Sequence, residues 1–161
     1  MNPSWLPPMV SVNGDAAEVF AMLYRVFSGD FRGAPKRLSG LPVWWDRRIA
    51  DPPYEEGFWH LITRLDKASG VRLLDPRRAE RLPWCGPVIA NSTAPEVAVW
   101  DYEEGSGRVR TYVWLLNHDY LVVLEKRQKR IGLVAFLVTA FHIDGPGKRA
   151  DLEKKLARRV A

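Results

Sequence analysis

The sequence is poor in the residues that build disulfides and metal centres. Its single cysteine, Cys85, has no partner for an internal disulfide. No Cys-x-x-Cys or His-x-x-x-His spacing occurs, which argues against a closed zinc site. A Ser-His-Asp order, a phosphate-cradling glycine loop and an acidic metal cluster are not recognisable either. We therefore expect no metal site and no cofactor.

Long apolar runs are also missing from the chain. No segment reaches the roughly 18 apolar residues of a membrane span. The N-terminal stretch MNPSWLPPMVSV does not have the basic region followed by an apolar region that marks a secretory signal. These absences predict a soluble cytoplasmic protein without a membrane partner.

What the chain does have is the length of one ordinary domain and an excess of basic residues. Its 161 residues are enough to bury a core without disulfides or metal ions. Lysine and arginine number 24 against 19 aspartates and glutamates, so the formal net charge is +5. Such a charge favours a polyanionic partner, although many basic proteins bind no nucleic acid.

Apolar spacing predicts a helix near the start of the chain. Residues 1–12 are rich in proline and are expected to form an irregular arm before a single domain of residues 13–161. In the segment 14–31, apolar residues recur three and four positions apart after Asp15, which suits a helix N-cap. Gly29 is expected to end this helix.

The next part of the chain mixes connections with helical signals. Residues 32–57 hold glycine, proline and charges but also apolar anchors, and they are interpreted as an ordered connection. The segment 54–68 predicts a second helix, with His60 beside its apolar stripe and Arg64 one turn further on. Residues 77–92 are expected to be a short helical or extended stretch, stopped by its prolines and glycine.

From residue 96 the apolar period changes from helical to alternating. Runs rich in β-branched and aromatic residues are separated by short polar turns, at residues 96–102, 108–117, 119–127 and 131–143. They predict an antiparallel meander of four strands, whose almost wholly apolar last member is central or covered on both faces. Residues 147–160 predict a short C-terminal helix with Leu152, Leu156 and Val160 inward and a basic outer face. The fold class is therefore α+β, with N-terminal helices packed on one face of a four-stranded antiparallel sheet.

Alternation along the second predicted strand separates two different faces. One side suits a core and carries Val109, Thr111, Val113 and Leu115. The other side carries Arg108, Arg110, Tyr112 and Trp114. Arginines interleaved with aromatic rings suit phosphate binding and base stacking, but a solvated face with aromatic cross-strand pairs explains them equally well.

Three polar residues, His60, Thr139 and His142, stand out against apolar surroundings. A histidine beside an apolar helix stripe, like His60, is more often a packed interior residue than a catalyst. Thr139 interrupts the last strand and can simply bond a neighbouring backbone group, while His142 can mark where that strand reaches solvent. Periodicity alone does not decide between packing and chemistry for these residues.

Arginines gather next to a tryptophan in the segment DPRRAERLPW. Arg77, Arg78 and Arg81 precede Trp84, a pattern that fits a solvated helix face or a site that holds RNA phosphate and stacks a base. The chemistry-bearing residues are thus histidine, arginine, tyrosine and threonine. This inventory suits metal-independent RNA cleavage, in which a base activates the ribose 2′-hydroxyl, cations stabilise the phosphorane and an acid protonates the leaving oxygen.

Five short blocks occur in the order in which similar blocks occur in one known family. They are LYRVFSGDF, GFWHLIT, RRAERLPW, PVIAN and FLVTAF. From about residue 18 to 158, the chain resembles a phage- and prophage-borne branch of the superfamily of RNases named after barnase, EndoU, colicin and RelE. The resemblance implies N-terminal helices before a four-stranded antiparallel sheet, and a toxin-like ribonuclease that cuts single-stranded or transfer RNA without metal.

The same resemblance implies roles for individual residues. His60 would be the general base or acid, Arg78 and Arg81 would hold phosphate, and Thr139 would contribute a hydroxyl to the scissile phosphate. The superfamily varies its catalytic residues between branches, so the assignment of acid and base stays open. A second histidine partner, if needed, would be His142 or His118. The candidate substrate-binding residues are Arg64, Trp84, Arg110, Tyr112 and His142.

The expected partner is RNA, such as transfer or messenger RNA, and the family leads us to expect an antitoxin or immunity protein. Two rival functions use the same residues. A non-catalytic nucleic-acid-binding module would bind RNA in a salt-dependent way without turnover. A phage or prophage accessory protein would use the sheet for protein–protein contact. The deciding feature is spatial, since the ribonuclease hypothesis expects one cleft to join His60, Arg78 or Arg81, Tyr112 and Thr139.

Overall fold

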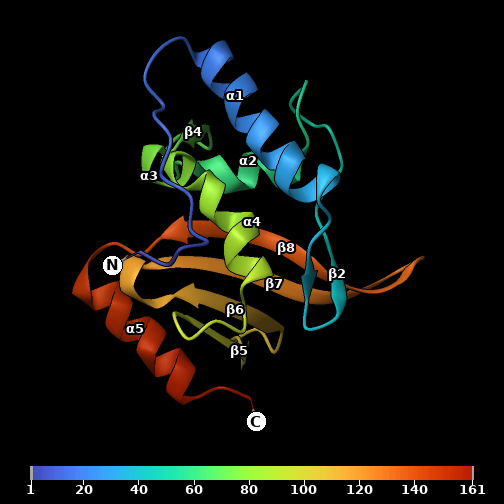
Figure 1. The fold of residues 1–161 in the computed structure, drawn as a ribbon, viewed down its shortest axis with the longest axis vertical. Coiled ribbons are helices and arrows are strands. Elements are labelled where there is room, and N and C mark those ends of the chain that lie inside the picture. The colour runs from blue at the N-terminus through green and yellow to red at the C-terminus, as the bar shows by residue number, and fades with distance from the viewer. Residues whose placement is uncertain (1, 161) are drawn as a thin grey trace.

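The structure is a computed structural model that describes residues 2–160. Met1 and Ala161, the outer ends of the predicted arm and of the predicted domain, lie outside the described residues. Within residues 2–160 the chain forms five α-helices, a curled mixed sheet of six strands and a small two-stranded hairpin (Figure 1). The α+β class is therefore confirmed, whereas the four-stranded antiparallel sheet is wrong. The division into an arm and one domain stays a prediction.

The first helix, α1, covers Ala16–Ser28 and begins where the sequence predicts. The Asp15 carboxylate accepts a hydrogen bond from the Glu18 backbone amide at 3.2 Å, which satisfies one of the free donors of the first turn. The predicted end at Gly29 is confirmed, since α1 ends at Ser28 with Gly29 as its C-cap, and the chain then continues as a π-helical turn, η1, over Gly29–Gly33. Gly29 keeps a right-handed helical backbone, so a change of helix type, and not a left-handed turn, marks the end of α1.

The four predicted strands all form, and neighbours along the chain pair antiparallel. They are β5 (Val97–Glu103), β6 (Val109–Leu115), β7 (Tyr120–Lys129) and β8 (Gly132–His142). The sheet order is β1-β2-β8-β7-β6-β5, so two further strands extend the sheet beyond β8. β8 is thus flanked by strands on both sides, as its apolar sequence predicts.

The two extra strands come from the segment expected to be only a connection. β1 (Arg37–Leu38) and β2 (Leu41–Trp44) form an antiparallel hairpin, and β2 then runs parallel to β8. The buried side chain of Val43 attaches this hairpin to the sheet. The strand is short and contains Pro42, which cannot donate a ladder hydrogen bond, so periodicity does not reveal it.

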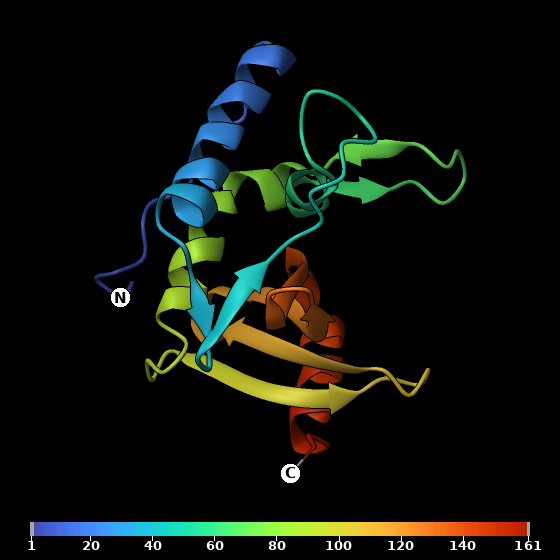
Figure 2. The same cartoon turned by 90° about the vertical axis from the view of Figure 1, so that its right-hand side faces the viewer.

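The second helix is much shorter than the sequence predicts. α2 covers Glu56–Ile62, and the chain then forms β3 (Thr63–Leu65) instead of continuing as a helix. The Thr63 hydroxyl donates to a backbone carbonyl of the last helical turn at 2.6 Å, which occupies a free acceptor at the helix end. β3 pairs with β4 (Arg72–Leu74) in a hairpin that projects away from the main sheet (Figure 2). Arg64 therefore lies on a strand and not on the helix.

The sequence predicts that prolines and a glycine interrupt the following segment, and this prediction is wrong. α3 covers Pro76–Glu80 and α4 covers Leu82–Ala90, so Pro83 and Pro87 lie within α4 and do not end it. Pro83 stands in the first turn, where no backbone donor is needed. Nearly every residue of α4 is buried, and this packing holds the helix together around Pro87.

Helices pack on both faces of the sheet and not on one alone. The larger core joins α1, α2 and α4 to inward side chains of the strands, including Val113, Leu115 and Val122. The alternate side chains of the same strands, including Tyr112 and Trp114, form a second cluster with Leu152 of α5 (Gly145–Ala157). No helix among residues 2–160 has the length and apolar character needed to cross a membrane. The predicted C-terminal helix is confirmed, and its position covers part of a face expected to be open.

Gly57 marks a close approach of α2 to the end of β2. A Cβ atom at this position would lie 2.9 Å from the Cβ atom of Trp45 and 3.0 Å from the Asp46 carbonyl oxygen. Gly57→Ala is therefore expected to lower the free energy of unfolding by about 1–3 kcal/mol, the usual cost of overpacking. Gly29→Ala is the control, because its added Cβ meets nothing within 4 Å. Equal denaturation midpoints of the two variants would contradict this packing of α2.

Candidate functional site

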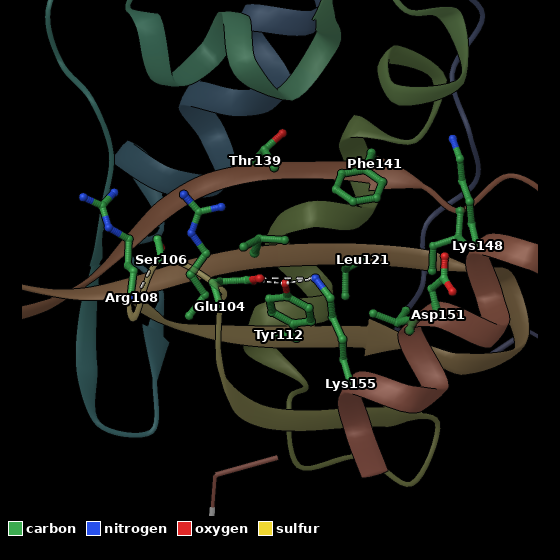
Figure 3. Close-up of a pocket in the computed structure, with 14 residues that line it drawn as sticks. Glu104, Ser106, Arg108, Tyr112, Leu121, Thr139, Phe141, Lys148, Asp151 and Lys155 are labelled. Atoms are coloured by element: carbon green, nitrogen blue, oxygen red, sulfur yellow. Dashed lines mark hydrogen bonds and ion pairs between the residues drawn. The ribbon is translucent and has the colours of Figure 1, made fainter. Parts of the chain in front are cut away.

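A cavity of about 850 Å³ opens on the face of the sheet that α5 partly covers. Its walls are the β5–β6 hairpin, strands β6 to β8 and helix α5 (Figure 3). Apolar side chains line it, among them Leu121, Val123, Phe141, Ile143 and Leu152. We call this side of the sheet the cavity face. A concave, largely apolar site of this size is typical of ligand-binding sites.

Basic side chains surround the apolar lining. The four cations come from the β6 side and from α5, and they are Arg108, Arg110, Lys148 and Lys155. The two carboxylates of the lining are Glu104 and Asp151. Cations therefore outnumber anions in the cavity, and an anionic ligand with apolar parts fits this combination.

The Tyr112 side chain lies between a carboxylate, Glu104, and an ammonium group, Lys155, inside the cavity (Figure 3). Its hydroxyl donates to a Glu104 carboxylate oxygen and accepts a hydrogen bond from the Lys155 ammonium at 2.9 Å. Burial, together with the bond to Glu104, raises the pKa of the Tyr112 phenol. Burial acts to lower the pKa of Lys155, but the bond to Tyr112 and the charge of Glu104 outweigh it, and the pKa is raised. At neutral pH the cavity therefore holds a phenol and an ammonium that both carry protons.

The predicted open face of arginines and aromatic rings is wrong for its aromatic half. Tyr112 and Trp114 are only 5% and 1% exposed, because α5 packs over them. The Arg149 guanidinium lies 4.8 Å from the centre of the Trp114 ring, and Leu152 completes the cover. Rings buried in this way cannot stack on a base. What stays open to a ligand on this face is the arginine end and the cavity, which the Tyr112 side chain lines.

Three of the predicted catalytic residues meet at the rim of the cavity. Thr139 on β8 lines the cavity, and its hydroxyl donates to the His60 carbonyl oxygen at 3.1 Å. One Nη group of Arg78 donates to the Thr139 hydroxyl and to the same carbonyl, both at 3.3 Å. Helices α2 and α3 are thereby joined to β8 at this point. Tyr112, Val123 and Thr139 are also direct partners across β6, β7 and β8, so phenol and hydroxyl share one row of the cavity face.

Arg78 has a clear structural task at this rim. Besides its bonds to Thr139 and His60, it donates to the Thr63 carbonyl at 2.8 Å, so it satisfies free acceptors at the end of α2. Burial lowers the pKa of Arg78, and the charge of Asp75 acts in the opposite direction. The guanidinium therefore holds α2 against β8 and positions the Thr139 hydroxyl. Contact with a phosphate would use its remaining N–H groups.

The His60 ring itself is not among the side chains that line the cavity. Its Nε2 atom lies 3.4 Å from the Arg72 guanidinium. Burial lowers the pKa of His60 and the charge of Arg72 lowers it further, although Glu56 and Asp46 act to raise it. The ring is therefore neutral at pH 7 and able to accept a proton. A substrate would have to extend over the rim to reach it.

The remaining predicted residues lie outside the cavity. Arg81 donates to a backbone carbonyl of α3 at 3.0 Å. Trp84 belongs to the larger core, and its Nε1 donates to a carbonyl of the N-terminal segment at 2.8 Å, so it is not free to stack on a base. Arg64 is exposed on β3, and His142 lies at the end of β8, where its ring contacts Asp144 at 3.1 Å. The structure thus does not bring these four side chains to the site.

Sequence reasoning missed the α5 wall of the cavity. Lys148, Asp151, Leu152 and Lys155 recur three and four positions apart, so one stripe of α5 faces the sheet. Helical periodicity is the signal that reveals this stripe. The sequence prediction assigns the basic residues to an outer face and Val160 to the inner one, yet Val160 is 48% exposed. That part of the prediction is wrong because two lysines, and not only leucines, turn toward the sheet.

Two further observations bear on the site. Among residues 2–160, no group of three or more His, Cys, Asp or Glu side chains is arranged to hold a metal ion. Comparisons with protein families, with curated proteins and with solved structures found no match to this chain.

Proposed function

We propose that the chain is a metal-independent ribonuclease whose substrate binds on the cavity face and is cut beside Thr139. The observation that carries the proposal is the contact between the cation-lined cavity and the rim formed by His60, Arg78 and Thr139. A single RNA strand joins charged phosphates to apolar base faces, which suits the cations and the apolar lining. The resemblance of five sequence blocks to a ribonuclease superfamily supports the same conclusion.

The proposed reaction is an attack of RNA on its own backbone. A base removes the proton of a ribose 2′-hydroxyl, and the 2′-oxygen forms a bond to the adjacent phosphorus. The bond from phosphorus to the 5′-oxygen of the next nucleotide breaks, and that oxygen takes a proton from an acid. The products are a 2′,3′-cyclic phosphate and a free 5′-hydroxyl. Guanidinium and ammonium groups stabilise the extra charge on the phosphorane.

Two groups at the site suit the two proton transfers. The neutral ring of His60 is suited to be the base, since burial and Arg72 hold its pKa below the ordinary value. The phenol of Tyr112 and the ammonium of Lys155 are in contact and keep their protons at neutral pH, which suits the acid. Arg78 acts on the reaction through Thr139, whose hydroxyl it positions.

Thr139→Val tests the rim directly. Valine keeps the β-branched shape but removes the hydroxyl, which in the proposed reaction turns its proton from the His60 carbonyl to the scissile phosphate. RNA cleavage is therefore expected to fall by about 10²- to 10³-fold, the usual cost of one lost transition-state donor. The assay uses single-stranded RNA in EDTA and identifies 2′,3′-cyclic phosphate ends. Thr111→Val is the matched control, since its hydroxyl bonds Asp101 at 2.6 Å on the other face of β6.

The outcomes of this assay are distinct. Equal activity of the two variants would remove Thr139 from the mechanism. An absence of cleavage by the unmodified protein, in EDTA and at low salt, would refute the ribonuclease proposal. Cleavage that leaves other ends would refute the 2′-hydroxyl attack.

A non-catalytic RNA-binding module is the second candidate, and one observation favours it. The His60 ring does not line the cavity, whereas the cations do. Binding of RNA that weakens with salt, without any cleaved product, would support this module over the enzyme.

The proposal includes the setting in which the protein works. Its substrate is cytoplasmic RNA, such as transfer or messenger RNA, and the protein acts in the cytoplasm. An antitoxin or immunity protein is the expected partner, because unrestrained RNA cleavage harms the cell that makes the enzyme. Difficulty in producing the unmodified protein, relieved by Thr139→Val, would agree with this setting.

A further inference from the structure

Three arginines share one carboxylate beside the cavity. Arg127 donates to a Glu125 carboxylate oxygen at 3.3 Å, and Arg108 and Arg110 lie 3.5 Å and 3.9 Å from the same carboxylate. The Glu125 side chain is only 11% exposed, whereas those of the three arginines are between 31% and 55% exposed. Each guanidinium carries five donors, far more than one carboxylate can accept. The cluster therefore has two uncompensated positive charges and many donors open to solvent.

The cluster continues the cavity along the same face of the sheet. Arg108 and Arg110 line the cavity, and Glu125 links them to Arg127. Glu125 is the direct cross-strand partner of Phe136 on β8, so the two side chains share a face. The Arg127 guanidinium lies 3.8 Å from the centre of the Phe136 ring, and the Lys129 ammonium lies 5.1 Å from it. A line of cations thus leads from the cavity to the β7–β8 turn.

The spacing of these cations suits a chain of phosphates. Side chains two residues apart on a strand lie about 6.6 Å apart on one face, which applies to Arg127 and Lys129 of β7. This separation is close to that of consecutive phosphates in an extended single strand. Arg108 directly precedes β6, two residues before Arg110. Phe136 is covered by Arg127 and Lys129, so it orients the cations by cation–π contact and does not stack on a base.

We propose that Arg108, Arg110 and Arg127 form a second phosphate site, and that the substrate is an extended single-stranded polynucleotide that runs from the cavity past this site to Lys129. The inference rests on the proposed function for the identity of the ligand as RNA. It adds that a short oligonucleotide in the cavity reaches only Arg108 and Arg110 of the cluster, while a longer one also engages Arg127. A mononucleotide or a small cyclic nucleotide would leave Arg127 without a ligand.

The test measures binding as a function of strand length and salt. The probes are oligonucleotides of 3 and 12 nucleotides made of 2′-O-methyl RNA, which has no free 2′-hydroxyl and is not cut by the proposed reaction. The logarithm of the binding constant falls linearly with the logarithm of the salt concentration, and for single strands each bound phosphate contributes about −0.7 to the slope. The 12-nucleotide probe is therefore expected to bind more tightly and with a steeper salt slope than the 3-nucleotide probe.

The variant Arg127→Gln isolates the cluster from the cavity. It is expected to lower the affinity for the 12-nucleotide probe roughly tenfold, which corresponds to the loss of one charge-assisted hydrogen bond. The affinity for the 3-nucleotide probe should not change. Lys126→Gln is the matched control, because it also removes one charge from β7 but its ammonium contacts Asp101 on the opposite face, at 3.4 Å. Thermal unfolding of both variants verifies that they are folded.

The possible outcomes separate this inference from the proposed function. Equal affinities for both probe lengths, or equal effects of Arg127→Gln and Lys126→Gln, would overturn the second phosphate site even if short RNA is cleaved. Length-dependent binding that is sensitive to Arg127, with no cleavage of unmodified RNA, would support the site and refute the ribonuclease. Failure of both probes to bind at low salt would overturn both.

Discussion

The His60→Ala variant is expected to cleave RNA about 10²- to 10⁴-fold more slowly than the unmodified protein, the usual contribution of a positioned proton-transfer group. In the proposed reaction the His60 ring takes the 2′-hydroxyl proton, because its lowered pKa leaves it neutral. Its contact to Arg72 is long, 3.4 Å, so the melting temperature should change little. Initial cleavage rates and thermal unfolding of the same preparations measure both effects.

The Tyr112→Phe variant separates the acid from the base. It removes the hydroxyl between Glu104 and Lys155 and keeps the ring that packs under α5. Tyr112→Phe should cleave RNA slowly, because the leaving 5′-oxygen needs a proton from the acid. A nucleoside 3′-(4-nitrophenyl phosphate) has a leaving group that needs no proton. With this substrate Tyr112→Phe should therefore be active, whereas His60→Ala should stay slow. Unchanged cleavage by His60→Ala would take His60 out of the reaction.

The pH dependence of cleavage gives an independent measure of the role of His60. Burial and the charge of Arg72 lower the pKa of His60, so the acidic limb of kcat/KM should lie below about pH 6.5, the ordinary value. Arg72→Gln removes a positive charge, raises the pKa of the imidazole and should move that limb to higher pH. The same lowered pKa makes folding less favourable as pH falls below about 6.5, because the unfolded chain then binds the proton more readily.

The Phe58→Ala variant is expected to lose about 3–5 kcal/mol of the free energy of unfolding, the usual cost of removing a buried ring. Phe58 is 0% exposed, and its ring lies between 5.1 and 5.7 Å from those of Tyr24, Phe27, Tyr54 and Trp59. Such a loss is a large part of the stability of an ordinary domain. Denaturant unfolding measures it.

Leu65→Ala is the matched control for this large effect. Leu65 is also apolar but is 63% exposed on β3, so its truncation should change stability by less than about 0.5 kcal/mol. A loss below about 1 kcal/mol in Phe58→Ala would contradict the aromatic cluster under α2. Because α2 also presents the His60 carbonyl to Thr139, Phe58→Ala should reduce cleavage even at temperatures where the variant is folded.

The strands of the meander were predictable because their signal is local. Alternation of β-branched and aromatic residues locates β5 to β8 within a few residues, and turn residues separate them. β2 was not predictable in this way, because its place depends on pairing with β8, about 90 residues further along the chain. The end of α2 also escaped prediction, since a helical period continues in the sequence after Ile62, where the chain pairs with β4 instead.

The residues of the candidate site were also predictable only where their signal is local. The arginines of β6 and the polar interruption at Thr139 are visible in the sequence, because each departs from a local pattern. Their partners are not visible, since Lys155 reaches Tyr112 only when α5 folds back over the sheet, and Arg78 reaches Thr139 only when α3 packs against β8. Trp84 has the composition of a stacking residue, yet burial in the core removes that possibility.

Local patterns thus specify the α+β class, the meander, the first helix and the residues able to carry charge or protons, because propensity and period act over a few residues. Long-range packing specifies which of these residues meet. It joins Arg78 and Thr139 at a rim, brings Lys148 and Lys155 into the cavity that Arg108 and Arg110 also line, buries Trp114, and leaves the His60 ring beside Arg72. The reason is that contacts between distant segments depend on the burial of whole helix and sheet faces, which no single segment encodes.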